Sequence, residues 1–138
     1  MHAPVRLLIA GAVATIAIAI PEIASGAIYS YTVAPKAQLS QRGTLVTLSG
    51  TITCDEGDQI ANYFTVTEVV GRTVRSAEQS IYPNWVTCTG VLQPWSITLR
   101  AFGTLPFLPG LAAEHSIPFD TYDFTVGPDN NQPIVLSP

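Results

Sequence analysis

The segment "CDEGD", residues 54–58, holds the side chains of this 138-residue chain that are best suited to chemistry. Cys54 could be a nucleophile, a metal ligand or half of a disulfide. A catalytic thiol needs a base such as histidine within reach. His115 is the only histidine after residue 27, and it stands in an alternating apolar segment. That setting is typical of a core or rim histidine with a hydrogen-bonded partner, so we expect Cys54 to pair with Cys88.

A metal site is the second chemistry that this segment allows. Zinc takes three or four Cys or His ligands at short spacing, whereas Cys54, Cys88 and His115 are widely separated. Calcium accepts flexible oxygen coordination, and the carboxylates available for it are Asp55, Glu56 and Asp58. The segment lacks the length and alternating ligands of a calcium loop. We therefore expect a solvated acidic turn with Gly57 at positive φ, with calcium as the alternative and no other metal or cofactor.

Patterns for other catalytic chemistry do not occur in the sequence. Glycoside hydrolysis needs two carboxylates roughly 5 to 9.5 Å apart across a cleft. Asp120 and Asp123 lie three residues apart in an expected strand, hence on opposite faces, and Glu68 and Glu78 have no evident cleft. There is no Gly-x-Ser-x-Gly elbow and no phosphate-binding loop. We predict that the protein is not an enzyme.

Residues 1–27 have the organisation of a secretory signal peptide. Arg6 precedes an apolar run over residues 7–20, Pro21 ends the run, and "ASGA" offers cleavage after Gly26 or Ala27. The run is shorter than the roughly 20 residues of a membrane-spanning helix. An uncleaved signal segment is thus the alternative, and the only membrane attachment we consider. We expect residues 28–138 to form one domain that is secreted or held at the cell envelope.

Charge and cysteine content narrow the class of this domain. The net charge is −4, and removal of residues 1–27 leaves it unchanged because Arg6 and Glu22 are lost together. A chain this acidic, with scattered arginines, is not suited to bind nucleic acid. Two cysteines in an oxidising compartment indicate a disulfide. Closing the loop between Cys54 and Cys88 stabilises the domain by about 4 kcal/mol in the chain-entropy model.

Apolar residues after residue 27 alternate with a period of two, which predicts strands. In the clearest case, residues 44–54, Val46, Leu48, Ile52 and Cys54 share one face. The other expected strands are 60–70, 72–77, 84–91, 95–101, 111–117 and 119–126, and the terminal segments 28–39 (broken at Pro35) and 134–136 can each supply a further strand. Residues 119–126 place Tyr122, Phe124 and Val126 on one face. Seven or eight short strands indicate a sandwich or small barrel, and two inward cysteines favour the sandwich.

Four segments in order carry a resemblance to a known type of domain: "VTLSGTITC" (46–54), "VTCTG" (86–90), "QPWSITL" (93–99) and "LPGLAA" (108–113). The chain resembles small secreted bacterial domains with an immunoglobulin-like β-sandwich, mostly of unassigned function. The resemblance implies an antiparallel sandwich with a structural or interaction role, and it transfers no catalytic residues. Val86 stands where antibody-type domains have the corner tyrosine, and no tryptophan follows Cys54 at the usual distance, so the strand order can differ.

Aromatic side chains are the best functional clue. If Cys88 points inward, alternation places Trp85 outward, with Tyr63 and Tyr82 as neighbours in a contact surface for a protein or an envelope polysaccharide. In the competing interpretation, a loop or an edge strand covers Trp85. Self-assembly by exchange of a terminal strand is a further hypothesis. The donors would be residues 27–35 or 132–138, which otherwise form the chain's own first and last strands.

Overall fold

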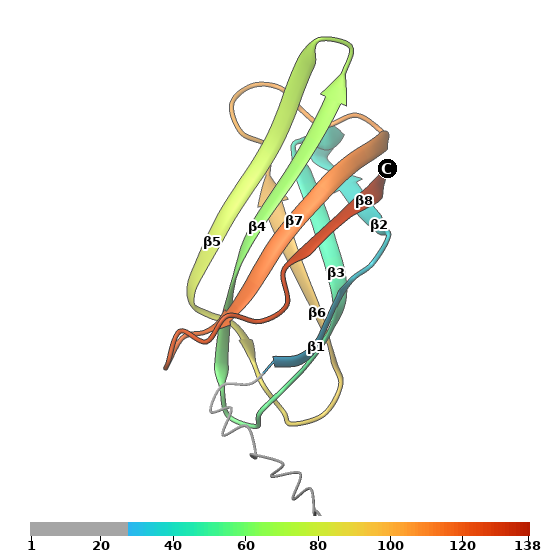
Figure 1. Ribbon diagram of the computed structural model, residues 1–138. Coiled ribbons are helices and arrows are strands. Elements are labelled where there is room, and N and C mark those ends of the chain that lie inside the picture. Colours follow the sequence, from blue (N-terminus) through green and yellow to red (C-terminus); the bar gives the residue numbers. More distant parts are fainter. Residues whose placement is uncertain (1–27) are drawn as a thin grey trace, which may run out of the picture.

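The computed structural model describes residues 28–138, apart from the side chains of residues 80–84. The expected signal peptide, residues 1–27, lies outside the described residues. The described chain is an all-β sandwich with one short 3-10 turn, Gln41–Gly43 (Figure 1). Its strands are β1 (Ile28–Val33), β2 (Lys36–Ser40), β3 (Leu45–Cys54), β4 (Gln59–Val70), β5 (Thr73–Thr87), β6 (Gln93–Arg100), β7 (Gly110–Asp120) and β8 (Asn130–Ser137).

The sandwich arises because one continuous sheet folds over on itself at β2. β3 pairs with β6 on one side and with β1 and then β2 on the other. β2 also pairs with β8, and the order continues through β7 and β4 to β5. The two layers are thus β1–β3–β6 and β8–β7–β4–β5, as in an immunoglobulin-like sandwich (Figure 1). All pairings are antiparallel except β2 with β8, which is parallel.

Apolar side chains from both layers fill the space between them. β3 and β6 alternate buried and more exposed positions, as a strand with one face on a core must. Fully buried members of this core include Leu48, Ile52, Phe64, Val66, Leu99 and Ile134. The alternation therefore predicted both the fold class and the faces of these strands correctly, and the break at Pro35 separates β1 from β2 as expected.

Two expected strands, 72–77 and 84–91, are one long strand with an irregularity. Between Ile60 and Asn62 on β4, the paired residue on β5 moves from Val86 to Ile81. More residues of β5 than of β4 are taken up there, so the strand bulges. A bulge interrupts the alternation of faces. Counting alternate positions back from Cys88 therefore does not give the face on which a side chain in the bulge lies.

The expected strand over residues 119–126 is wrong. β7 ends at Asp120, and only a single bridge joins Phe119 to Val126. The chain turns because the Asp120 carboxylate accepts the N–H groups of Tyr122, at 2.7 Å, and Asp123, at 3.1 Å. Such local side-chain bonds compete with a strand ladder. The segment is a short hairpin rather than a strand.

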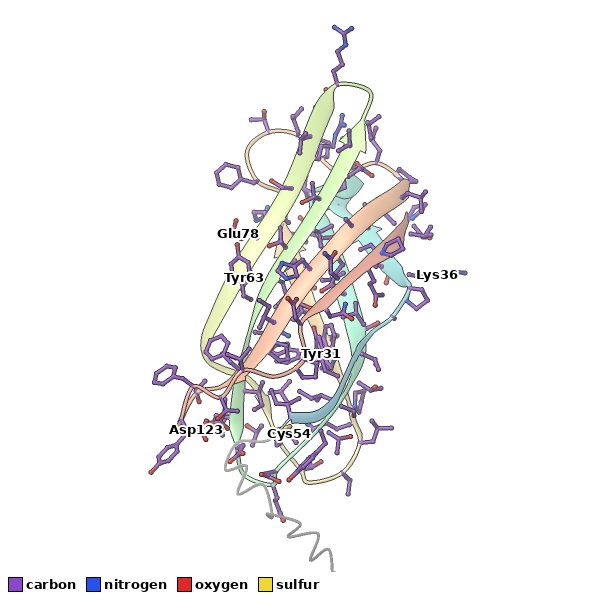
Figure 2. All side chains as sticks on the ribbon, in the orientation of Figure 1. Tyr31, Lys36, Cys54, Tyr63, Glu78 and Asp123 are labelled. Carbon is purple, nitrogen blue, oxygen red and sulfur yellow. A yellow bond between two sulfur atoms is a disulfide. The ribbon has the colours of Figure 1, made fainter. Side chains whose placement is uncertain are left out.

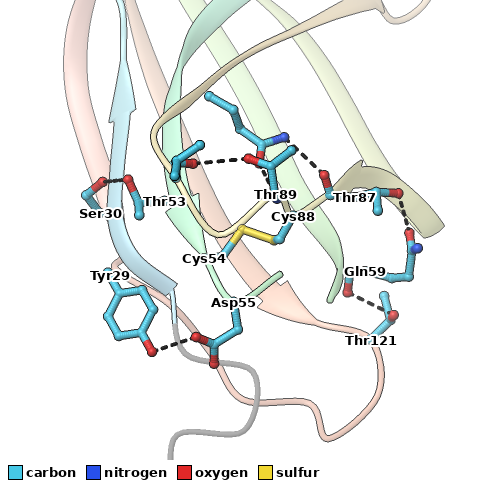
Figure 3. Close-up of a disulfide and its surroundings, with 12 residues drawn as sticks. Tyr29, Ser30, Thr53, Cys54, Asp55, Gln59, Thr87, Cys88, Thr89 and Thr121 are labelled. Atoms are coloured by element: carbon cyan, nitrogen blue, oxygen red, sulfur yellow. Dashed lines mark hydrogen bonds between the residues drawn. A yellow bond between two sulfur atoms is a disulfide. The ribbon is translucent and has the colours of Figure 1, made fainter. Parts of the chain in front are cut away.

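The disulfide between Cys54 and Cys88 is present, as predicted, with 5.5 Å between the Cα atoms. It joins the last residue of β3 to the residue that follows β5 (Figure 3). Around it, the Cys88 N–H donates to the Asp58 carbonyl at 2.8 Å, and the Gly57 N–H donates to the Cys88 carbonyl at 2.9 Å. The disulfide and these two hydrogen bonds therefore fix the acidic segment 55–58 against the end of β5. We call the end of the sandwich that holds them the disulfide end.

Candidate functional site

The expected surface of Tyr63, Tyr82 and Trp85 is not assembled. Trp85 packs on the core, with ring centroids 5.0 Å from Trp95 and 5.4 Å from Phe64. The outward orientation predicted for Trp85 is wrong because the bulge in β5 interrupts the alternation counted from Cys88. Tyr63 lies on β4 and is half-buried. The side chain of Tyr82 lies outside the described residues.

Exposed aromatic rings gather instead on the loop after β7. Tyr122 is 89% exposed and Phe124 is 64% exposed. The loop projects from the disulfide end, where Asp123 marks it (Figure 2). We call residues 120–126 the aromatic loop. Phe102 is 80% exposed and belongs to the connection between β6 and β7. That connection lies at the other end of the sandwich from the disulfide (Figure 1).

Hydrogen bonds hold the aromatic loop in one conformation. The Asp120 N–H donates to the Thr125 carbonyl at 2.9 Å, and the Gly127 N–H donates to the Pro118 carbonyl at 2.7 Å. At the tip, the Phe124 N–H donates to the Asp120 carbonyl at 3.0 Å. The Asp123 carboxylate accepts the Thr125 N–H at 2.9 Å. A loop with this many internal bonds presents its side chains at little cost in conformational entropy.

Phe124 adopts a left-handed backbone conformation, with φ of 60°. This conformation costs a residue with a Cβ roughly 1–2 kcal/mol. Glycine and asparagine are the usual residues where a turn closes in this way. A bulky ring that is kept at a strained and exposed position points to a use for the ring outside the fold.

Carboxylates surround the base of the loop and make the disulfide end acidic. The Tyr29 hydroxyl donates to Asp55 Oδ1 at 2.6 Å (Figure 3), and this bond raises the pKa of the Tyr29 phenol. Burial, followed by the nearby Asp120 carboxylate, raises the pKa of Asp58. Such a surface repels anions and favours neutral or cationic groups.

The residues first considered for chemistry take structural positions. Cys54 is in the disulfide and has no free thiol. His115 lies on the rim and hydrogen bonds to Asp129 at 2.7 Å, as expected of a rim histidine. Asp55, Glu56 and Asp58 do not converge; among residues 28–138, no three His, Cys, Asp or Glu side chains are grouped to hold a metal ion.

Two pockets in the described part of the chain are small and are lined by residues outside the aromatic loop. One of about 230 Å³ is lined by apolar residues that include Leu39, Phe107 and Leu108, together with Arg42. A second, of about 130 Å³, lies beside Pro106. Small-molecule sites usually occupy roughly 300–1,000 Å³. The geometry therefore favours contact through an exposed surface over enclosure of a ligand.

Sequence reasoning missed the exposure of Tyr122 and Phe124 on a loop, although the signal for a turn was present. Aspartates at 120 and 123, followed by Gly127 and Pro128, are typical of a turn closed by carboxylates. Alternating aromatic residues between them indicated a strand instead. Read as a turn, the same residues expose both rings.

Comparison with known proteins finds no family model that matches the chain and no curated protein with significant similarity to it. Within residues 28–138, no helix has the length and apolar character to cross a membrane.

Proposed function

We propose that this protein is an exported, non-catalytic binding domain that acts at the cell envelope or outside the cell, and that the aromatic loop is its contact surface. The observation that carries the proposal is the exposure of Tyr122 and Phe124 on a loop that its own hydrogen bonds hold in place. Exposed aromatic rings bury a large apolar area on binding and lose little rotamer entropy. The disulfide supports export, because such bonds persist in oxidising compartments.

A neutral polysaccharide is the ligand class that this surface fits best. Aromatic rings can stack on the apolar faces of sugar rings, and carboxylates accept hydrogen bonds from sugar hydroxyls. Asp55 and Asp123 supply carboxylates at the same end of the sandwich as the two rings. The net charge of −4 disfavours acidic glycans. A protein partner is the alternative occupant.

Self-assembly by strand exchange has less support. β1 pairs with β3 over residues 28–33, and β8 pairs with both β7 and β2. Either terminal strand would have to leave these pairings before it could complete the sheet of another subunit. The pairing supports the interpretation of both termini as the chain's own strands, and wild-type protein that stays monomeric at high concentration would remove the assembly hypothesis.

The binding proposal is tested by sedimentation of the mature domain with insoluble cellulose and chitin. We expect the wild type to be depleted from solution by at least one of them. Replacement of both rings, Tyr122→Ala with Phe124→Gly, should weaken binding by roughly 30-fold or more, as the loss of hot-spot side chains does. Phe102→Ala is the matched control and should bind like the wild type. Equal binding by the loop variant would refute the role of the loop, and binding to neither polymer would refute the ligand class.

A further inference from the structure

Two carboxyl groups lie close together at the base of the aromatic loop, where β4 begins and β7 ends. Asp58 directly precedes β4, and Asp120 is the last residue of β7. The neighbouring Gln59 and Thr121 join these strand ends, since the Thr121 N–H donates to the Gln59 carbonyl at 2.9 Å. β4 and β7 pair Ile60 with Asp120, which brings the Asp120 carboxyl group close to Asp58, and burial together with this negative charge raises the pKa of Asp58.

One oxygen of each group is buried and has nothing to bind. Asp120 is only 1% exposed, and its Oδ1 accepts two loop N–H groups while its Oδ2 has no partner. The Oδ2 atom of Asp58 is likewise buried without a partner. Two ionised carboxylates cannot donate to each other, so this contact requires something positive between them. Buried polar atoms without partners are rare enough to indicate an atom that completes the site.

We propose that Asp58 and Asp120 hold a calcium ion between their Oδ2 atoms, and that this ion fixes the aromatic loop to the end of the sandwich. Calcium fits because it takes carboxylate oxygens in flexible geometry and fills its remaining positions with water. Asp55 and Asp123 add negative charge near Asp58. Among the residues that the structure describes, no lysine or arginine forms an ion pair with Asp58 or Asp120.

This site differs from the calcium loop that the sequence suggested. Only Asp58 belongs to both, and Asp120 is the last residue of a strand much further along the chain. Extracellular calcium modules bind with dissociation constants of about 10⁻⁴–10⁻³ M, and we expect the same range for a site with two protein carboxylates. The inference does not depend on what the aromatic loop binds.

The test is calcium binding and thermal unfolding of the mature, disulfide-bonded domain. Isothermal titration calorimetry with CaCl₂ should show one site per chain. At 10 mM CaCl₂ the Tm should rise by about 5–10 °C over the value in EDTA at matched ionic strength. Asp58→Asn should lose both effects. Glu78→Gln, which removes the same charge from an exposed position on β5, should keep both.

The alternative to a calcium ion is a proton shared by Asp58 and Asp120, and the same variants distinguish the two. If the two carboxyl groups instead share a proton, the wild type will show no calcium binding and no calcium-dependent Tm. Asp58→Asn will then raise the Tm at pH 7 without calcium, because an amide can donate to Asp120 without the proton that the carboxyl pair must take up at that pH. That pair of results would overturn the calcium site. Equal calcium responses of wild type and Asp58→Asn would overturn it as well, because the ion would then bind elsewhere.

Discussion

Replacement of Trp85 by alanine distinguishes a core residue from a surface platform. The indole packs edge-on against Phe64 and Trp95, with interplanar angles of 73° and 67°. It also meets Tyr31 with ring centroids 6.2 Å apart. We expect Trp85→Ala to destabilise the domain, because it leaves a cavity where three rings lose a neighbour.

The expected cost follows from the burial of the ring. Tryptophan-to-alanine changes in cores cost about 3–5 kcal/mol, and the partial exposure of Trp85 places it near the lower limit. With an unfolding entropy of about 2.1 cal/mol/K per residue and about 111 residues, 3 kcal/mol lowers Tm by roughly 13 °C. Trp85→Phe should cost only about 1–2 kcal/mol, because it keeps one ring and the Trp85 Nε1 has no hydrogen-bond partner to lose.

The assay is thermal and urea unfolding of the oxidised mature domain, followed by circular dichroism. Tyr122→Ala, on the exposed loop, should change stability by less than about 0.5 kcal/mol and serves as the control. Trp95→Phe offers a second comparison, because Trp95 Nε1 donates to the Thr32 carbonyl at 3.2 Å. It should cost about 1 kcal/mol more than Trp85→Phe. A Trp85→Ala variant that melts with the wild type would refute the core assignment and restore Trp85 as a surface residue.

Three further predictions concern the aromatic loop, the interior and the disulfide. Phe124→Gly removes the exposed ring and relieves the strain of the left-handed backbone at φ 60°. Calorimetry should show an unchanged or higher Tm. A lower Tm would contradict the claim that this conformation is strained. Burial raises the pKa of Glu114 above 4.5, so its contribution to stability is full below that value and is lost as pH rises through the raised pKa. Tm should therefore fall as pH increases above about 4.5, less steeply in Glu114→Gln than in the exposed control Glu78→Gln; equal slopes would contradict the assignment. The exported chain should begin at Ala27 or Ile28, weigh two hydrogens less than its reduced form and resist alkylation; replacing both cysteines by alanine should cost about 2–5 kcal/mol, and a full-length chain with two free thiols would contradict export.

The alternation of apolar and polar residues correctly predicted the strands whose backbone is regular. The alternation through Val46, Leu48 and Ile52 identified β3 and its buried face, and it placed Cys54 inward toward Cys88. These positions are regular, so side chains two residues apart share a face throughout.

The positions considered for binding depend on irregular backbone, which alternation cannot describe. Trp85 turns toward the core because β5 bulges where it meets Ile60 and Asn62. Tyr122 and Phe124 reach solvent because Asp120 stops the strand with its carboxylate. The contact between Asp58 and Asp120 exists only in the folded chain, since β4 and β7 must pair to form it. Periodicity carries no signal for such tertiary contacts.

Binding through the aromatic loop is tested most directly by an NMR titration of the ¹⁵N-labelled mature domain with cellohexaose and chitohexaose, chosen as soluble neutral glycans. We expect amide shift changes for at least one of them to concentrate at residues 120–126 and at Tyr29, and to disappear in the Tyr122→Ala, Phe124→Gly double variant. Changes centred on the free edge of β5 or around Phe102, or saturable binding that survives the double variant, would contradict the claim that the aromatic loop is the contact surface.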